Sequence, residues 1–165
     1  MRRVVITGLG AVSPIGIGVN AFWTALRSGV SGIGRITKFD PSGFPSQIAG
    51  EVRDFDPLTF LSRRDVVRTD TFIHYALTAA FEALTDAKLT TDTRKDRVGV
   101  SIGTGMGGIP LLMAAYDTLK QEGPGVVSPY TMPGVLPNMA AGWVSMRTGA
   151  SGPIAAPTTA CAAGS

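Results

Sequence analysis

The chain has 165 residues, of which 44% are hydrophobic, 16% charged and 7% aromatic. This length suits one domain, or half of a larger one. The mean hydropathy of +0.22 is too high for a disordered segment. The 21 glycines and 11 prolines are too many for a helical bundle. The composition therefore disfavours disordered and all-helical proteins.

The charge and the apolar runs restrict the partners and the compartment. The 15 basic and 12 acidic residues, a net charge of +3, are interleaved and contain no binding motif for nucleic acid, so we expect no such partner. The longest apolar stretch, residues 132–144, is broken by prolines and glycines and is shorter than the roughly 20 residues of a membrane span. The basic start at Met1, Arg2 and Arg3 leads into an apolar run that ends at Thr7, too short for a signal peptide. We expect a cytoplasmic protein without membrane contact.

The first third of the chain predicts two strands and a helix. Residues 3–7 form a β-branched run, typical of a strand buried on both faces. A helix is predicted over residues 20–27, with Asn20 as its cap and Gly29 as its C-terminal stop. Residues 47–52 alternate weakly and predict a strand at a sheet edge.

The rest of the chain alternates helices with strands, which is typical of an α/β protein. Asp56 and Pro57 predict a helix start, and Asp70 is the predicted cap of the longest helix, which extends to Ala87. The elements that follow are a strand over residues 98–102, a glycine loop at 103–108, helices over 110–120 and 138–147, and a small apolar run at 154–160.

Two glycine-rich segments imitate nucleotide-binding loops. Gly8 and Gly10 follow the first predicted strand, but the third glycine of the pattern is missing. Residues 103–108 satisfy G-x-G-x-x-G, and Glu122 has the spacing of a ribose-binding acid, although it lies in a Gly/Pro loop. A dinucleotide site is one alternative. The other, which we favour for Gly8 and Gly10, is close backbone packing, while the later loop would line an apolar channel through Met106.

Cys161 is the single cysteine and cannot form an internal disulfide. Its small neighbours, residues 162–165, would let the chain turn sharply from a strand into a helix, where the helix N-terminus lowers the pKa of a thiol. The alternative is a buried, inert cysteine. His74, the single histidine, lies in the longest predicted helix without a paired acid, so we interpret it as structural or solvent-facing.

Several separated motifs follow one another along the chain, in residues 4–10, 13–16, 31–33, 39–40, 103–108, 137–142, 152–153 and 159–164. With this set, the whole chain resembles the N-terminal portion of a β-ketoacyl-acyl-carrier-protein synthase of the elongating type II kind, a condensing enzyme of the thiolase superfamily. The resemblance implies an α/β fold with thiolase-like αβαβα layers, of which only the incomplete N-terminal half is present.

The resemblance assigns Cys161 as the nucleophile that accepts the acyl group. The implied reaction is attack of the thiolate on an acyl thioester, followed by decarboxylation of a malonyl thioester and condensation, in fatty acid elongation. The backbone N–H of Cys161 is one implied donor of the oxyanion hole. The family takes two histidines and a lysine from its C-terminal half, and the resemblance gives His74 no catalytic role. We expect no metal and no other cofactor.

The resemblance also assigns residues around the substrate. Met106 corresponds to a bulky apolar residue that gates the acyl pocket, and its flexible thioether could yield to chains of different length. Thr131 and Met132 correspond to a loop that reaches the pocket of the neighbouring subunit in the family's homodimer. Ordinary core and loop roles are the alternative for these three residues.

A basic cluster contains Arg63, Arg64 and Arg68. Such a cluster is usually a solvated helix face, but Arg64 and Arg68 correspond to basic positions that dock the acidic acyl carrier protein in the family. Val67 stands where another basic residue is frequent, which would weaken the patch.

Synthases of this family have two thiolase-like halves, whereas this sequence ends four residues after Cys161. We therefore expect residues 1–165 to be one N-terminal domain, truncated just after the nucleophile and inactive alone. Pro157 lies in the expected nucleophile strand and requires a bulge or strand end. The alternatives are a polyketide-type ketosynthase, a noncatalytic chain-length factor, which would lack the nucleophile, and a nucleotide-binding oxidoreductase.

Overall fold

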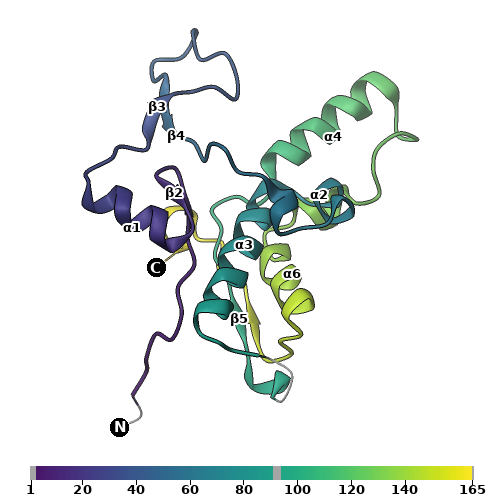
Figure 1. The fold of residues 1–165 in the computed structure, drawn as a ribbon. Coiled ribbons are helices and arrows are strands. Elements are labelled where there is room, and N and C mark those ends of the chain that lie inside the picture. The colour runs from purple at the N-terminus through teal and green to yellow at the C-terminus, as the bar shows by residue number, and fades with distance from the viewer. Residues whose placement is uncertain (1–2, 91–93, 165) are drawn as a thin grey trace.

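The computed structural model describes residues 3–90 and 94–164, so Met1, Arg2 and Ser165 lie outside the described residues. Its centre is an α/β unit in which helix α3 (Thr71–Asp86) lies beside helix α6 (Met139–Thr148) and a short pair of strands (Figure 1). The N-terminal elements lie on one side of this unit. Helix α4 (Ile109–Glu122) projects from it on another side (Figure 1).

The strand pair of the centre is parallel and joins β5 (Val100–Ser101) to β6 (Ile154–Ala155). Backbone pairing continues beyond the strands, where the N–H of Thr104 donates to the carbonyl oxygen of Pro157 at 3.1 Å. Pro157 therefore acts as an acceptor, a role that does not need the N–H it lacks. The strand predicted at 98–102 is confirmed, and so is a strand end before Pro157.

A small hydrophobic core lies between α3 and α6. Ile73 and Leu77, one helical turn apart on α3, are completely buried and form a cluster with Leu61, Ala140 and Val144. Burial of a large aliphatic side chain contributes about 1.5–3 kcal/mol, so this contact is the main apolar stabilisation of the centre.

Helix α1 (Val19–Arg27) follows a short antiparallel pair of β1 (Val12–Ser13) and β2 (Gly16–Ile17). The helix ends as predicted, with Gly29 in the left-handed region at a φ of 67°. The helix predicted over residues 20–27 is therefore confirmed.

The start of α1 differs from the prediction. Its N-cap is Gly18 and not Asn20, which lies inside the helix. Glu82 of α3 supplies the acceptor that Gly18 lacks, because the N–H of Val19 donates to Glu82 Oε1 at 2.8 Å. The cap of α1 therefore comes from a residue distant in the sequence.

Residues 3–7 form no strand, so the predicted first strand is wrong. The side chain of Val4 is 97% exposed, and no strand among the described residues pairs with this segment. A strand needs a ladder partner, which local sequence cannot supply. The close-packing interpretation of Gly8 and Gly10 is confirmed, because a Cβ at either position would overlap a carbonyl oxygen of α3.

Strand β3 (Ile33–Arg35) pairs antiparallel with β4 (Ile48–Gly50), which confirms the edge strand predicted at 47–52. This hairpin stands apart from the centre of the molecule (Figure 1).

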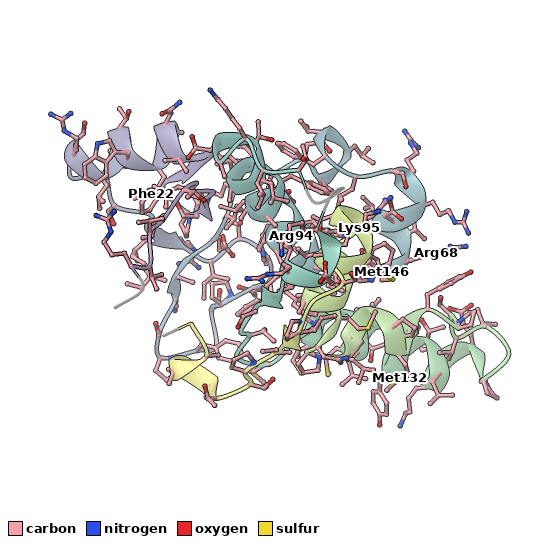
Figure 2. All side chains as sticks on the ribbon, turned by 90° about the horizontal axis from the view of Figure 1, so that it is seen from below. Phe22, Arg68, Arg94, Lys95, Met132 and Met146 are labelled. Carbon is pink, nitrogen blue, oxygen red and sulfur yellow. The ribbon has the colours of Figure 1, made fainter. Side chains whose placement is uncertain are left out.

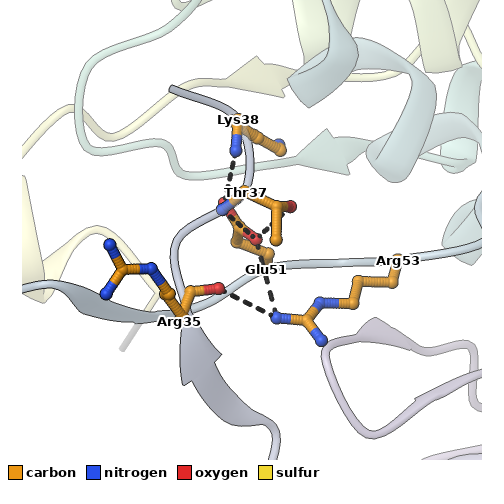
Figure 3. Close-up of polar contacts among 5 residues, drawn as sticks. All are labelled: Arg35, Thr37, Lys38, Glu51 and Arg53. Atoms are coloured by element: carbon orange, nitrogen blue, oxygen red, sulfur yellow. Dashed lines mark hydrogen bonds and ion pairs between the residues drawn. The ribbon is translucent and has the colours of Figure 1, made fainter. Parts of the chain in front are cut away.

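A carboxylate beside β4 fixes the base of this hairpin (Figure 3). Glu51 accepts hydrogen bonds from the N–H of Thr37 (3.1 Å), its hydroxyl (2.8 Å) and the N–H of Lys38 (3.2 Å). These bonds, those of Thr37 first, hold the pKa of Glu51 below its usual value. Arg53 lies 3.8 Å from Glu51 and donates to the carbonyl oxygen of Arg35 at 3.1 Å.

The connecting segments contain short helices, of which those at residues 57–59 and 63–68 begin with side-chain caps, Asp56 and Ser62. The predicted start at Asp56 is confirmed, since its carboxylate accepts the N–H of Leu58 at 2.9 Å, although the helix there is a single 3-10 turn. The remaining elements are η1 (Pro57–Thr59), α2 (Arg63–Arg68), η2 (Lys95–Arg97), α5 (Thr131–Val135) and η3 (Ala160–Ala162).

No helix in residues 3–90 and 94–164 combines the length and apolar character needed to cross a membrane.

His74 has the structural environment that the sequence indicated. It is 5% exposed, and its Nε2 lies 2.9 Å from the hydroxyl oxygen of Thr69. That hydroxyl donates to the carbonyl oxygen of Asp65 at 2.6 Å, so the ring nitrogen is the donor to Thr69. Burial lowers the pKa of His74.

Substitution of Gly10 by alanine should destabilise the fold, because the new Cβ would overlap the carbonyl oxygen of Ala79. We expect a loss of about 1–3 kcal/mol in the unfolding free energy, measured by urea denaturation of the full chain. Gly43→Ala is the matched control, since no atom lies within 4 Å of a Cβ there. Equal effects of the two substitutions would contradict the packing role.

His74 should make the fold sensitive to mild acid. Its folded pKa lies below that of the unfolded chain, near 6.5, so the unfolded state takes up the proton first as the pH falls. The unfolding free energy should therefore decrease between about pH 7 and about pH 5.5, and less so in His74→Gln. Urea midpoints at the two pH values test this, and identical decreases in both proteins would exclude His74 as the cause.

Candidate functional site

Cys161 lies on an exposed turn that follows β6. Ala160, just before it, has a φ of 50°, in the left-handed region that disfavours a side chain. The turn then closes through hydrogen bonds from Ala162 to Thr159 and from Ala163 to Ala160, both 3.1 Å. A sharp turn is therefore present at Cys161, but β6 ends at Ala155, before the turn, and a single 3-10 turn stands where the sequence predicts a helix.

The turn of Cys161 packs on the glycine loop of residues 103–108. A Cβ at Gly103 would overlap the carbonyl oxygen of Ala163, and one at Gly105 would lie 3.7 Å from that of Ala160. Only a residue without a side chain allows the approach at Gly103. The main chain of Gly103 and Gly105, in the first half of the glycine loop, therefore packs directly against the turn of Cys161.

The second half of the glycine loop packs on α5. The N–H of Gly108 donates to the carbonyl oxygen of Val135 at 3.0 Å, and a Cβ at Gly107 would lie 2.6 Å from the same oxygen. The glycines that imitate a nucleotide site are therefore covered by main chain. In the described residues, no group of three His, Cys, Asp or Glu side chains is placed to hold a metal ion.

The candidate substrate residues are distributed along these contacts. Met106 lies in the middle of the loop, between its two packed halves, and its side chain is 69% exposed. Thr131 is buried at the start of α5, whereas Met132 is 55% exposed and lies at the edge of the molecule (Figure 2). The loop thus connects the turn of Cys161 at one end with the helix of Thr131 and Met132 at the other.

The candidate docking residues, Arg64 and Arg68, lie on α2. Arg64 is exposed, and Arg68 points outward with its guanidinium 4.0 Å from the ring centre of Tyr130 (Figure 2). Arg64 and Arg68 line a pocket of about 490 Å³, and Met146 of α6 also lines it. Val67 is 80% exposed, so an apolar side chain lies within the basic face.

Sequence reasoning missed Arg147, which changes the charge of this face. Its guanidinium forms an ion pair with Asp65 of α2, which also accepts the hydroxyl of Ser62 at 2.7 Å. Asp65 is 8% exposed, so the acid within the basic helix is both buried and neutralised. No local signal could have found this pair, because its partners are 82 residues apart.

Comparisons with known proteins agree with this arrangement. The sequence model described as "Beta-ketoacyl synthase, N-terminal domain" matches residues 1–165. A 3-oxoacyl-[acyl-carrier-protein] synthase 2 of Coxiella burnetii is 48% identical over 164 residues, which are 99% of this chain and 40% of that protein. The protein of the same name from Synechocystis is 44% identical over 165 residues, with the same coverage of both chains.

A solved structure gives the same result. The ishigamide ketosynthase/chain length factor superposes with a TM-score of 0.81 and 31% identity, over 96% of this chain and 40% of that chain. The chain thus spans about two fifths of the length of the relatives it matches. The resemblance read from the separated motifs and the thiolase-like fold class are confirmed, and the chain belongs to the β-ketoacyl synthase family, where it corresponds to the N-terminal domain.

Proposed function

We propose that this chain supplies the acyl-accepting cysteine of a 3-oxoacyl-[acyl-carrier-protein] synthase that elongates fatty acids. The observation that carries the proposal is the exposed thiol of Cys161 on a strained turn at the end of a parallel strand. An exposed cysteine on such a turn is open to a substrate thioester, unlike the buried cysteine of the alternative interpretation. The names of the curated relatives support this reaction class.

In the first half-reaction, the thiolate of Cys161 attacks the carbonyl carbon of an acyl thioester. The thiol of the carrier leaves, and the acyl group remains bound to sulfur. Negative charge develops on the carbonyl oxygen during this step. The N–H of Cys161 donates no hydrogen bond within the described part of the chain, so it is free to stabilise that oxygen.

In the second half-reaction, a malonyl thioester loses carbon dioxide, and the resulting carbanion attacks the acyl group on Cys161. A carbon–carbon bond forms, and the Cys161 thiolate leaves. His74 is buried and bonded to Thr69, so it takes no part in this chemistry. The proposal assigns proton transfer and the second oxyanion donor to the C-terminal half of the enzyme.

The glycine loop and α5 form the acyl-chain side of the proposed site. Met106 gates the pocket, and its exposed thioether side chain adapts to the acyl group that passes it. Met132 completes the pocket of a neighbouring copy in a homodimer, whereas Thr131, which is buried at the start of α5, supports that segment from within its own chain. The exposure of Met132 at the edge of the molecule supports this assignment.

The basic face of α2 is the proposed dock for an acidic acyl carrier protein. Arg64 and Arg68 provide the charge that steers association. The ion pair between Asp65 and Arg147 supports the proposal, because it removes a negative charge that would repel an acidic partner.

A polyketide-type ketosynthase is the second candidate, because the solved ketosynthase/chain length factor has the same fold at 31% identity. The two candidates share the reaction at Cys161 and differ in substrate. A noncatalytic chain-length factor is not favoured, since Cys161 is present and exposed.

Replacement of Cys161 by serine should abolish acyl transfer. The loss of the thiolate should reduce kcat for an acyl thioester by about 1,000-fold or more in the full-length enzyme. Mass spectrometry should find the acyl group, or a cerulenin adduct, on the peptide of Cys161 in the unsubstituted enzyme and on no peptide of Cys161→Ala. An acyl adduct that persists in the alanine variant would overturn the assignment.

Charge reversal on α2 should weaken docking and leave chemistry intact. Arg64→Glu with Arg68→Glu should raise KM for a carrier-bound acyl substrate about tenfold, which corresponds to about 1.4 kcal/mol, and should spare a small carrier-free thioester. Arg94→Glu with Lys95→Glu, at and beside η2, is the matched control with the same change in net charge (Figure 2). Equal effects on both substrates would refute the docking role.

A further inference from the structure

Asp70 stands at the start of α3, but its carboxylate caps a different helix. It occupies the N-cap position of α3, where its side chain makes no capping hydrogen bond. Its Oδ2 instead accepts the N–H of Leu111, 41 residues along the chain, at 2.8 Å. Leu111 is the third residue of α4, whose own N-cap, Gly108, has no side chain to offer. Asp70 therefore provides the cap that α4 lacks.

The environment of Asp70 makes this bond important. Asp70 is 7% exposed, so water does not readily replace its carboxylate as the acceptor for the Leu111 N–H. The carboxylate also lies at the N-terminal, positive end of the α4 dipole, which attracts negative charge. Loss of the carboxylate would leave the first turn of α4 without this anchor.

The first turn of α4 directly continues the glycine loop that carries Met106. A Cβ at Gly108 would lie 2.9 Å from Cβ of Asp70 and 2.8 Å from the carbonyl oxygen of Gly134. The loop is thus held at its far end by Asp70 and α5, and at its near end by the turn of Cys161. Met106 lies between the two anchors, and its side chain is 69% exposed.

We propose that Asp70 is a positioning residue that fixes the glycine loop and so sets which acyl chain lengths Met106 admits to Cys161. This inference rests on the proposed function of the loop as the acyl gate. With the bond to Leu111 in place, only the side chain of Met106 yields to a substrate. Without that bond, the main chain from Gly107 to Leu111 shifts as well, and the gate discriminates less between short and long chains.

The test compares acyl transfer from carrier-free short-chain and long-chain thioesters in the full-length enzyme. In Asp70→Ser, the hydroxyl can cap α3 but is too short to reach Leu111, so α3 is preserved and the link is lost. We expect the ratio of kcat/KM for the two chain lengths to change at least about threefold in this variant. Asp70→Asn, whose amide oxygen can accept the same bond, should restore the ratio.

Asp56→Ser is the matched control, because Asp56 caps η1 with the same chemistry at 2.9 Å and has no contact with the loop among the bonds described. It should leave the ratio unchanged. Amide hydrogen exchange gives a readout besides activity: exchange at Gly107 and Gly108 should become faster in Asp70→Ser and remain unchanged in Asp56→Ser.

The outcomes separate this inference from the proposed function. If the unsubstituted enzyme does not acylate Cys161, the proposed function fails, whatever the exchange data show. If it acylates Cys161 but Asp70→Ser keeps both the chain-length ratio and the slow exchange, the positioning role of Asp70 is wrong. An altered ratio in Asp56→Ser as well would assign the effect to general destabilisation and would also overturn the inference.

Discussion

Helix α3 organises the rest of the chain by binding backbone N–H groups of segments that pack around it. Glu82 accepts the N–H groups of Ala11 (3.0 Å) and Val19 (2.8 Å), and Asp86 accepts that of Leu9 (3.0 Å). At the other end, Asp70 accepts the N–H of Leu111 at 2.8 Å. Hydrogen bonds to a charged group contribute about 1.5–3 kcal/mol each where water is largely excluded. The part-buried bonds of Glu82 and Asp70 therefore add to the stabilisation by the small apolar core.

Helix α3 thus combines a buried apolar stripe with acidic side chains at its two ends that accept hydrogen bonds from other segments. One stripe, with Ile73 and Leu77, faces α6 and forms the core. The carboxylates at the two ends provide acceptors for the first turns of α1 and α4, both of which begin after a glycine. Gly18 permits the turn before α1 with a φ of 88°, and Gly108 permits close packing before α4. The carboxylates of Glu82 and Asp70 supply the acceptors that glycine lacks.

The sequence predicted features whose cause is local. The capping of Leu58 by Asp56, the ends of α1 and α6 at glycines, and the apolar spacing of α3 depend on neighbours within a few residues. The predictions that the structure contradicts depend on distant residues instead. The segment at 3–7 would need a strand partner to form a strand, and the side chain of Asp70 caps the distant helix α4 and not α3. In both cases the decisive contact is with a residue far away in the sequence.

The candidate site shows the same difference between features with a local cause and features that depend on distant residues. Composition around Cys161 left two interpretations open, a reactive thiol and a buried one, and only the set of separated motifs favoured the first. The structure adds that the thiol is exposed and that Gly103 makes room for the main chain of its turn. The sequence could not predict the pair of Asp65 and Arg147, because an ion pair between residues 82 positions apart has no periodic or spacing signal.

The turn of Cys161 includes an unfavourable backbone conformation, whose free-energy cost the surrounding contacts must offset. Ala160 has a Cβ at a φ of 50°, a conformation that costs roughly 1–2 kcal/mol for a residue with a side chain. The bond from Thr104 to Pro157 fixes the chain before the turn, and the close approach of Ala163 to Gly103 fixes it after the turn. Both anchors belong to one glycine loop, whose far end depends on Asp70. The strained turn that presents the sulfur is thus supported, through that loop, by the same helix that organises the fold.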